Sequence, residues 1–219
     1  MTTYADSLLV ALLALDLYMV STNRLGSCIR ASALQGVLLS ALPVLVSGIG
    51  PSSSFWDAMH LAAIVIGTLC VKGLLIPWVL FRAMRSRGET REFEPFVSLH
   101  LSQVINGVLC GGAFWIATGL SLPAANGHAM GLAVGLATLF IGLYMIINRH
   151  NSISQVLGFL VVESGVMVIA WALLRKPSFV IEVGALLDVL VAVMVLGVLA
   201  TSLEATGSEG GVRKGDTSQ

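Results

Sequence analysis

The chain has 219 residues, of which 56% are hydrophobic and 11% are charged. Because a soluble domain carries about 25% charged residues, this composition excludes an ordinary soluble protein. The formal net charge is zero and no basic or acidic tail stands out, which argues against nucleic acid as a partner. The composition therefore predicts an integral membrane protein.

Apolar windows of about 20 residues predict an all-α fold with about seven transmembrane helices. In chain order the windows cover residues 7–22, 31–49, 58–81, 98–120, 128–147, 155–174 and 178–203. The N-terminal stretch lacks the basic start of a cleaved signal peptide. We therefore expect the first apolar segment to be retained as a membrane span.

The basic residues between these windows predict the orientation in the membrane. One side would carry Arg24, Arg30, Arg82, Arg85, Arg87, Arg91, Arg149, Arg213 and Lys214. The other side would carry only Arg175 and Lys176. Because cytoplasmic loops are enriched in Lys and Arg, we expect the N-terminus outside and the C-terminus in the cytoplasm.

The chain contains an internal repeat: "LALDLYMVSTNRLGSC" (13–28) resembles "LFIGLYMIINRHNSIS" (139–154). Helices 1–3 are then a duplicate of helices 5–7, in a parallel arrangement known among transporters. This predicts three-helix units at 1–87 and 128–203, joined by a cytoplasmic loop and linking helix at 88–127. Residues 204–219 are rich in Gly, Ser and charge, as expected of a mobile cytoplasmic tail.

Three ionisable residues lie near the centres of predicted spans: Glu163, Asp188 and Lys72. Such a residue costs about 3 kcal/mol on insertion scales and by default marks an ion pathway or a partner contact. Burial disfavours the charged form of each group, so each can act as a station for a proton. The alternative is that they are paired or hydrogen-bonded and only fix the helix packing. Under the repeat, Glu163 corresponds to Gln35 and Asp188 to Lys72.

Other polar residues are secondary candidates. Asp16 lies late in the first helix and is expected to be an interfacial or packing charge. Glu182, at the outer start of the last helix, is either the mouth of a pathway or an interfacial charge. His60 and His100 lie near span ends, where a lone histidine is more often a hydrogen-bonded interfacial group than a ligand.

Patterns typical of catalysts are missing from the sequence. The three cysteines are widely scattered, and no His, Cys, Asp and Glu cluster has metal-ligand spacing. No Gly-rich phosphate loop and no Ser–His–Asp set is evident. We therefore expect no metal, no cofactor and no catalysis by this chain alone. Glycines spaced every fourth residue, at 127, 131 and 135 and at 107 and 111, predict close helix packing.

The second half resembles known membrane subunits of energy-converting complexes. "NRHNSISQVLGFLVVESGVMVIAW" followed by "IEVGALLDVLVAVMVLGVLA" resembles the K-type three-helix subunit of respiratory complex I. It is also similar to the C-type subunit of multisubunit Na⁺/H⁺ antiporters. Glu163 matches the mid-membrane acid of the complex I subunit. Asp188 stands where that family usually has a second Glu, so this match is the less secure of the two.

The whole chain resembles the hydrogenase-4 component E family, on "VKGLLIPW", "SQVLGF…VESG" and "EVGALLDVLVAV". The resemblance implies a non-catalytic membrane-arm subunit of a group 4 [NiFe]-hydrogenase or formate hydrogenlyase complex. The implied partners are antiporter-like subunits, a complex I-like anchor subunit, and cytoplasmic subunits with NiFe and iron–sulfur centres. It implies a place in the bacterial inner membrane, with Glu163, Asp188 and Lys72 contributing to a charged axis for proton or sodium movement.

Two other functions stay open. The chain could belong to a cation/proton antiporter without a redox module, or it could be a purely structural spacer between antiporter-like subunits.

Overall fold

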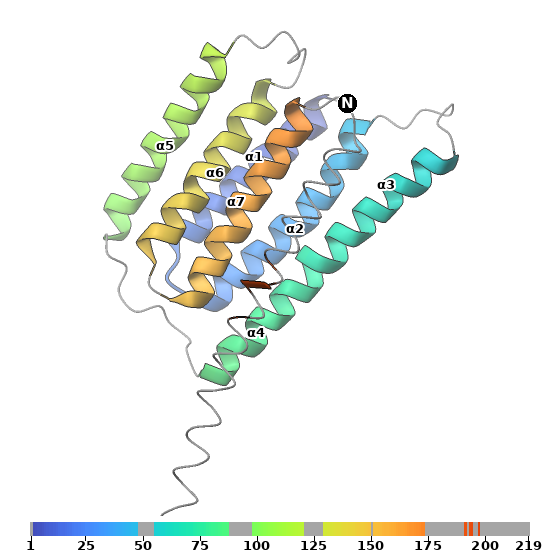
Figure 1. Cartoon of the computed structure of the whole chain (residues 1–219). Helices are drawn as coiled ribbons and strands as arrows, with labels where there is room; N and C mark the ends of the chain where they lie inside the picture. The colour runs from blue at the N-terminus through green and yellow to red at the C-terminus, as the bar shows by residue number, and fades with distance from the viewer. Residues whose placement is uncertain are drawn as a thin grey trace, which may run out of the picture.

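The computed structural model describes residues 2–47, 55–87, 98–120, 129–149 and 151–173, together with positions 191, 193, 194 and 197. All regular structure in these residues is helical. The elements are α1 (Thr2–Ser21), α2 (Leu25–Ser47), α3 (Phe55–Thr68), the π-helix η1 (Leu69–Leu75), α4 (Ile76–Arg87), α5 (Leu99–Gly119), α6 (Ala129–Asn148) and α7 (Ser152–Leu173) (Figure 1).

Six of the described helical stretches are long and apolar enough to cross a membrane. They match the first six predicted windows, because α3, η1 and α4 follow one another without a break and together form the third. The all-α membrane fold is therefore confirmed. The seventh window, 178–203, lies outside the described residues except for four helical positions. One of these, Val191, is fully buried in a cluster with residues of α2, α4 and α7.

Helix ends differ from the apolar windows by several residues. α2 begins at Leu25 rather than at 31, and the backbone N–H groups of Ser27 and Cys28 donate to the Arg24 carbonyl at 3.0 and 3.1 Å. Likewise, α4 continues to Arg87 rather than ending at 81. An apolar window counts side chains, whereas a helix continues into polar residues as long as its backbone hydrogen bonds are made.

The helices form a bundle in which α1 and α6 run in one direction and α2 and α7 in the other (Figure 1). The shared direction is what a parallel repeat requires, although the division into two three-helix units stays a prediction. α1 and α6 end where α2 and α7 begin, and α4 ends there too. Arg24, Arg82, Arg85 and Arg149 lie at this end. We call it the arginine end; which side of the membrane it faces also stays a prediction.

Glycine allows α6 and α7 to pack backbone to backbone. A Cβ on Gly142 would lie 2.6 Å from the Val162 backbone nitrogen, and one on Gly165 would lie 2.7 Å from that of Leu139. Small residues permit such close approach where lipid provides no hydrophobic drive. Of the three glycines predicted to pack closely here, Gly135 meets Ile169 and Gly165, and a Cβ on Gly131 would lie 3.3 Å from that of Ala172. Gly127 lies outside the described residues.

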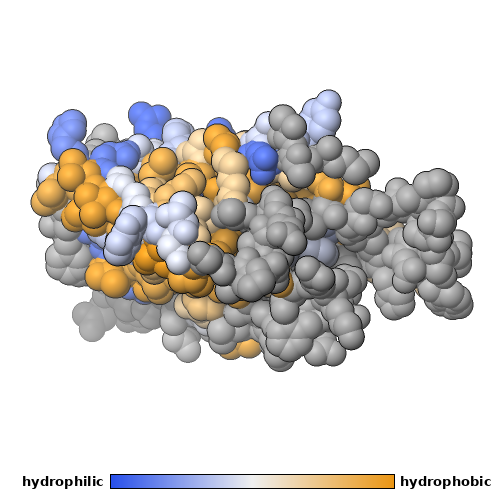
Figure 2. Space-filling view, turned by 90° about the horizontal axis from the view of Figure 1, so that it is seen from above, coloured by the Kyte–Doolittle hydropathy of each residue, from blue (hydrophilic) through white to orange (hydrophobic). Residues whose placement is uncertain are grey.

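The corresponding expectation for α5 is not met within the described residues. Added Cβ atoms at Gly107 and Gly111 would meet nothing within 4 Å. Large apolar side chains are exposed on the same helix, including Val104, Val108 and Trp115. Hydrophobic residues also cover much of the described surface seen in Figure 2. This is the surface expected of a bundle whose outer faces meet lipid or other apolar helices.

Substituting Gly142 tests the tight α6–α7 contact. We expect Gly142→Ala to lower the stability of the detergent-solubilised chain by about 1–3 kcal/mol, because the new methyl group meets backbone that cannot move aside. The matched control is Gly107→Ala, which should be neutral or stabilising by up to about 1 kcal/mol, since Ala favours helix over Gly. Thermal unfolding of both variants measures the difference, and equal effects would contradict the packing.

Candidate functional site: a buried ion pair and a buried aspartate

Among the described residues, four Asp, Glu, Lys or Arg side chains are buried: Asp16, Lys72, Arg149 and Glu163. Two of them were the central predictions from the sequence, one was a secondary candidate, and one was not singled out. Removing a charge from water costs several kcal/mol unless a partner compensates it. The partners of these four residues therefore define the candidate site.

Lys72 and Glu163 form an ion pair, with Lys72 Nζ 3.0 Å from Glu163 Oε1. The two side chains are 5% and 0% exposed, so the pair is enclosed by the bundle. Lys72 lies midway along α3–η1–α4 and Glu163 lies at the centre of α7. The repeat related Glu163 to Gln35 and Lys72 to Asp188, but it gave no sign that Lys72 and Glu163 themselves meet.

The backbone around Lys72 is unusual. Lys72 is at the centre of the π-helix η1, and the Ile76 N–H closes it by donating to the Val71 carbonyl. Pro77 follows directly; it has no N–H to donate and its ring crowds the preceding turn, which favours a wider turn before it. Such π-helical turns are rare and occur frequently at functional sites.

Gly36 in α2 fixes the position of this turn against the bundle. A Cβ on Gly36 would lie 2.9 Å from both the carbonyl carbon and the Cβ of Lys72. Only a glycine therefore lets α2 and η1 approach this closely. The result is that the Lys72 backbone is held against α2, while its side chain reaches Glu163 on α7.

Asp16 is the second buried carboxylate, and it is fully enclosed rather than at the surface. Gln35 Nε2 donates to Asp16 Oδ1 and Thr138 Oγ1 donates to Asp16 Oδ2, each at 2.7 Å. Each carboxylate oxygen thus accepts a hydrogen bond from a different helix, α2 or α6. Of the two sequence interpretations, the structure agrees with a packed charge and not with an interfacial one.

The two buried clusters are adjacent because α2 joins them. Gln35 contacts Asp16, and the next residue, Gly36, contacts the backbone of Lys72. A carboxylate, an amide, an amine and a second carboxylate therefore occupy one buried polar layer that crosses four helical segments. The two carboxylates and the amine can take up and release protons, and the Gln35 amide donates a hydrogen bond that holds Asp16 in place.

Arg149 is the functional candidate that the sequence interpretation missed. Its Nη2 donates to the carbonyls of Met19 and Thr22 at 2.6 and 3.2 Å, and its Nη1 lies 3.6 Å from Cys28 Sγ. A cation at the C-terminal end of a helix is stabilised by the unpaired carbonyls there. The repeated "NR" was the available signal, but it suggested only a cytoplasmic surface charge.

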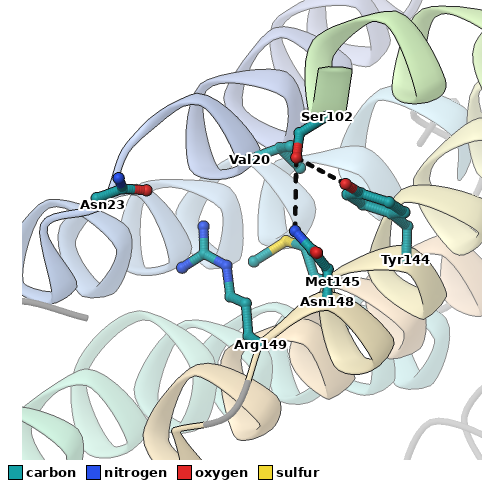
Figure 3. A pocket seen from close by; sticks show the side chains of 7 residues that line it. All are labelled: Val20, Asn23, Ser102, Tyr144, Met145, Asn148 and Arg149. Atoms are coloured by element: carbon teal, nitrogen blue, oxygen red, sulfur yellow. Dashed lines mark hydrogen bonds between the residues drawn. The ribbon is translucent and has the colours of Figure 1, made fainter. Parts of the chain in front are cut away.

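A small pocket lies beside Arg149 at the arginine end (Figure 3). Its polar lining includes Asn23, Ser102, Tyr144 and Asn148, from α1, α5 and α6 and the segments that adjoin them. The Ser102 and Tyr144 hydroxyl groups are 2.6 Å apart, and Asn148 Nδ2 donates to Ser102 Oγ at 3.5 Å. The pocket holds about 10 Å³, which is close to the room that one water molecule needs.

The remaining candidates fall elsewhere. Asp188 and Glu182 lie outside the described residues, as does the side chain of His60. His100 is exposed at the start of α5, so the structure does not bring it to the buried layer. Within the part of the chain that the structure describes, no three His, Cys, Asp or Glu side chains are arranged to hold a metal ion.

Comparison with known proteins gives sequence relatives only. No family model and no solved structure matches the chain significantly. An uncharacterized protein of Mycobacterium tuberculosis is 32% identical over 180 residues, which cover 82% of this chain and 79% of that protein. Hydrogenase-4 component E of Escherichia coli K12 is 30% identical over 168 residues, which cover 74% of this chain and 76% of that protein. The same protein of Shigella flexneri gives the same values. On this similarity, and with six apolar helices long enough to span a membrane, the chain belongs to the hydrogenase-4 component E family.

Proposed function

We propose that this chain is a membrane subunit of an energy-coupling hydrogenase complex, in which it contributes buried charged residues to a proton or ion pathway. Family membership supports a place in a hydrogenase complex. The enclosed Lys72–Glu163 pair carries the proposal for translocation, because a bundle that needed only to pack would avoid the cost of burying two charges.

The pair is suited to holding a proton transiently. With both groups ionised, Glu163 balances the Lys72 ammonium. A proton arriving at Glu163 neutralises the carboxylate and leaves Lys72 as an unbalanced cation. That state favours passing a proton onward, because an unpaired charge in low dielectric is costly. The chain would thus supply a station, while neighbouring subunits supply the source and the exit.

The proposed partners follow from the resemblance of the chain. They are antiporter-like membrane subunits, a complex I-like anchor subunit, and cytoplasmic subunits that carry NiFe and iron–sulfur centres. Electron transfer to protons would be coupled to ion movement across the bacterial inner membrane, and the arginine end would face the cytoplasm. Asp188 and Glu182 stay proposed members of the pathway. His100 does not lie with the buried residues and is not included.

A structural spacer is the second candidate, and the Lys72–Glu163 pair itself favours it. An ion pair that is closed at 3.0 Å also holds η1 against α7, as a fixed packing contact would. A cation/proton antiporter subunit without a redox module is the third. Three experiments separate these functions.

Co-purification tests the complex. A tagged full-length chain, extracted in mild detergent, should bring antiporter-like membrane proteins together with subunits that contain nickel and iron. Mass spectrometry identifies the proteins, and elemental analysis quantifies the metals. Antiporter-like partners without metal would point to the antiporter instead, and a stable, partnerless chain would contradict both functions.

Substituting Glu163 tests the pathway. In inverted membrane vesicles, Glu163→Gln should lower the rate of hydrogenase-driven proton movement by about 100-fold or more, because a positioned acid–base group contributes roughly that factor to the rate of proton transfer. The control is Ser164→Ala, a buried neighbour whose hydroxyl group donates to the Leu160 carbonyl at 2.9 Å. A spacer predicts instead that Glu163→Gln complexes that assemble keep full proton movement.

A double substitution separates assembly from conduction. Removing one partner of a buried ion pair costs about 3–5 kcal/mol, whereas replacing both by neutral groups is often tolerated. We therefore expect Lys72→Met to reduce the amount of assembled complex. Lys72→Met with Glu163→Gln should restore assembly, measured by blue native electrophoresis, without restoring proton movement. Recovery of both properties would contradict a proton-carrying role.

A further inference from the structure

The inner face of α5 carries two buried polar side chains. Ser102 and Asn106 are 2% and 0% exposed and lie one helical turn apart. Asn106 Nδ2 donates to the Ser102 carbonyl at 2.7 Å. Since a carbonyl can only accept, the amide oxygen of Asn106 is turned away from it.

Two buried amide oxygens near the arginine end have no hydrogen-bond partner among the described residues: Asn106 Oδ1 and Asn148 Oδ1. Asn148 lines the pocket at the arginine end (Figure 3) and is itself only 7% exposed. Leaving a buried acceptor unpaired costs about 1–3 kcal/mol. Buried polar atoms are therefore nearly always paired, with water where the protein offers no partner.

The pocket and Asp16 lie about one helical turn apart along the axis of the bundle. Val20 lines the pocket, and Asp16 is four residues earlier in α1, which is about 6 Å along the helix axis. On α5, Ser102 is at the pocket, Asn106 is one turn deeper, and Cys110 is one turn beyond that. Cys110 packs against the buried cluster that contains Met19 and Ile141.

Asn106 is likewise four residues from a pocket residue, Ser102, so it lies one helical turn deeper than the pocket, at about the depth of Asp16. We infer that the pocket, Asn106 and Asp16 form a water path through which Asp16 exchanges protons with the aqueous phase at the arginine end. The exchange is balanced: hydronium gives a proton to the Asp16 carboxylate and becomes water, and the reverse step returns it. Gln35 and Thr138 hold the carboxylate at the inner end of the path.

This inference deepens the proposed function, because it gives the buried layer an access route from one side of the membrane. The role of that route in coupled proton movement rests on the proposed function. The presence of water, however, can be measured without any hydrogenase activity. Substituted cysteines report it, because the thiolate is the reactive form and burial in apolar surroundings suppresses it.

The experiment uses the full chain in inverted vesicles, in a background with Cys70→Ala and Cys110→Ala that keeps the buried Cys28. Ser102→Cys and Asn106→Cys are treated with a small, positively charged methanethiosulfonate reagent. The control is Ala113→Cys on the same helix, a fully buried position seven residues beyond Asn106. Both test positions should react about tenfold or more faster than the control, since the apolar control site lacks the water that favours thiolate.

Either test position reacting no faster than Ala113→Cys would overturn the path, provided that the variant accumulates in the membrane like the unsubstituted chain. If Asn106→Cys does not accumulate, the labelling rate of the near-isosteric Ser102→Cys, at the outer end of the path, tests the proposal instead. Asp16→Asn then separates the presence of the water path from the role of Asp16 in proton movement. Labelled cysteines with unchanged proton movement in Asp16→Asn would leave the water path standing and remove Asp16 from the proposed function.

Discussion

The structure depends on one constraint: charges buried in an apolar bundle must be compensated inside it. Lys72 and Glu163 meet this constraint together, at 3.0 Å, and neither could stay charged in its place without the other. Their contact determines much of the surrounding geometry. A π-helical turn carries Lys72, and Gly36 lets that turn lie against α2. The ion pair is therefore an enclosed contact between η1 and α7.

α2 connects the two ends of the buried layer. Its residue Gln35 hydrogen-bonds Asp16, and its residue Gly36 contacts the Lys72 backbone. An amide is well suited to this position, because it donates to a carboxylate without adding a charge that would need its own partner. Arg149 is likewise stabilised without a second charge, by carbonyl groups at the end of α1. Each buried charge is thus matched by groups from another helix.

Burial could be predicted from the sequence wherever the residue type alone was informative. Lys72 and Glu163 stand out because an ionisable side chain within a long apolar run is costly, and both are buried. Asp16 and Arg149 look different in sequence, since each lies near a predicted span end where exposed charge is ordinary. Their burial depends on Thr138 and Met19, which are 122 and 130 residues away from them in the chain. No local pattern reports contacts at that separation.

The sequence by itself determined the all-α membrane fold and the first six spans, because apolar side chains must face lipid or the bundle interior and leave a signal in every window. It also placed Lys72 within the third span and Glu163 within the sixth. Only the tertiary structure decided which charges meet, that Asp16 and Arg149 are enclosed, and that the third span contains a π-helical turn. These features depend on how closely neighbouring helices approach, and that distance is set by residues such as Gly36 and Gly142 facing backbone from distant parts of the chain.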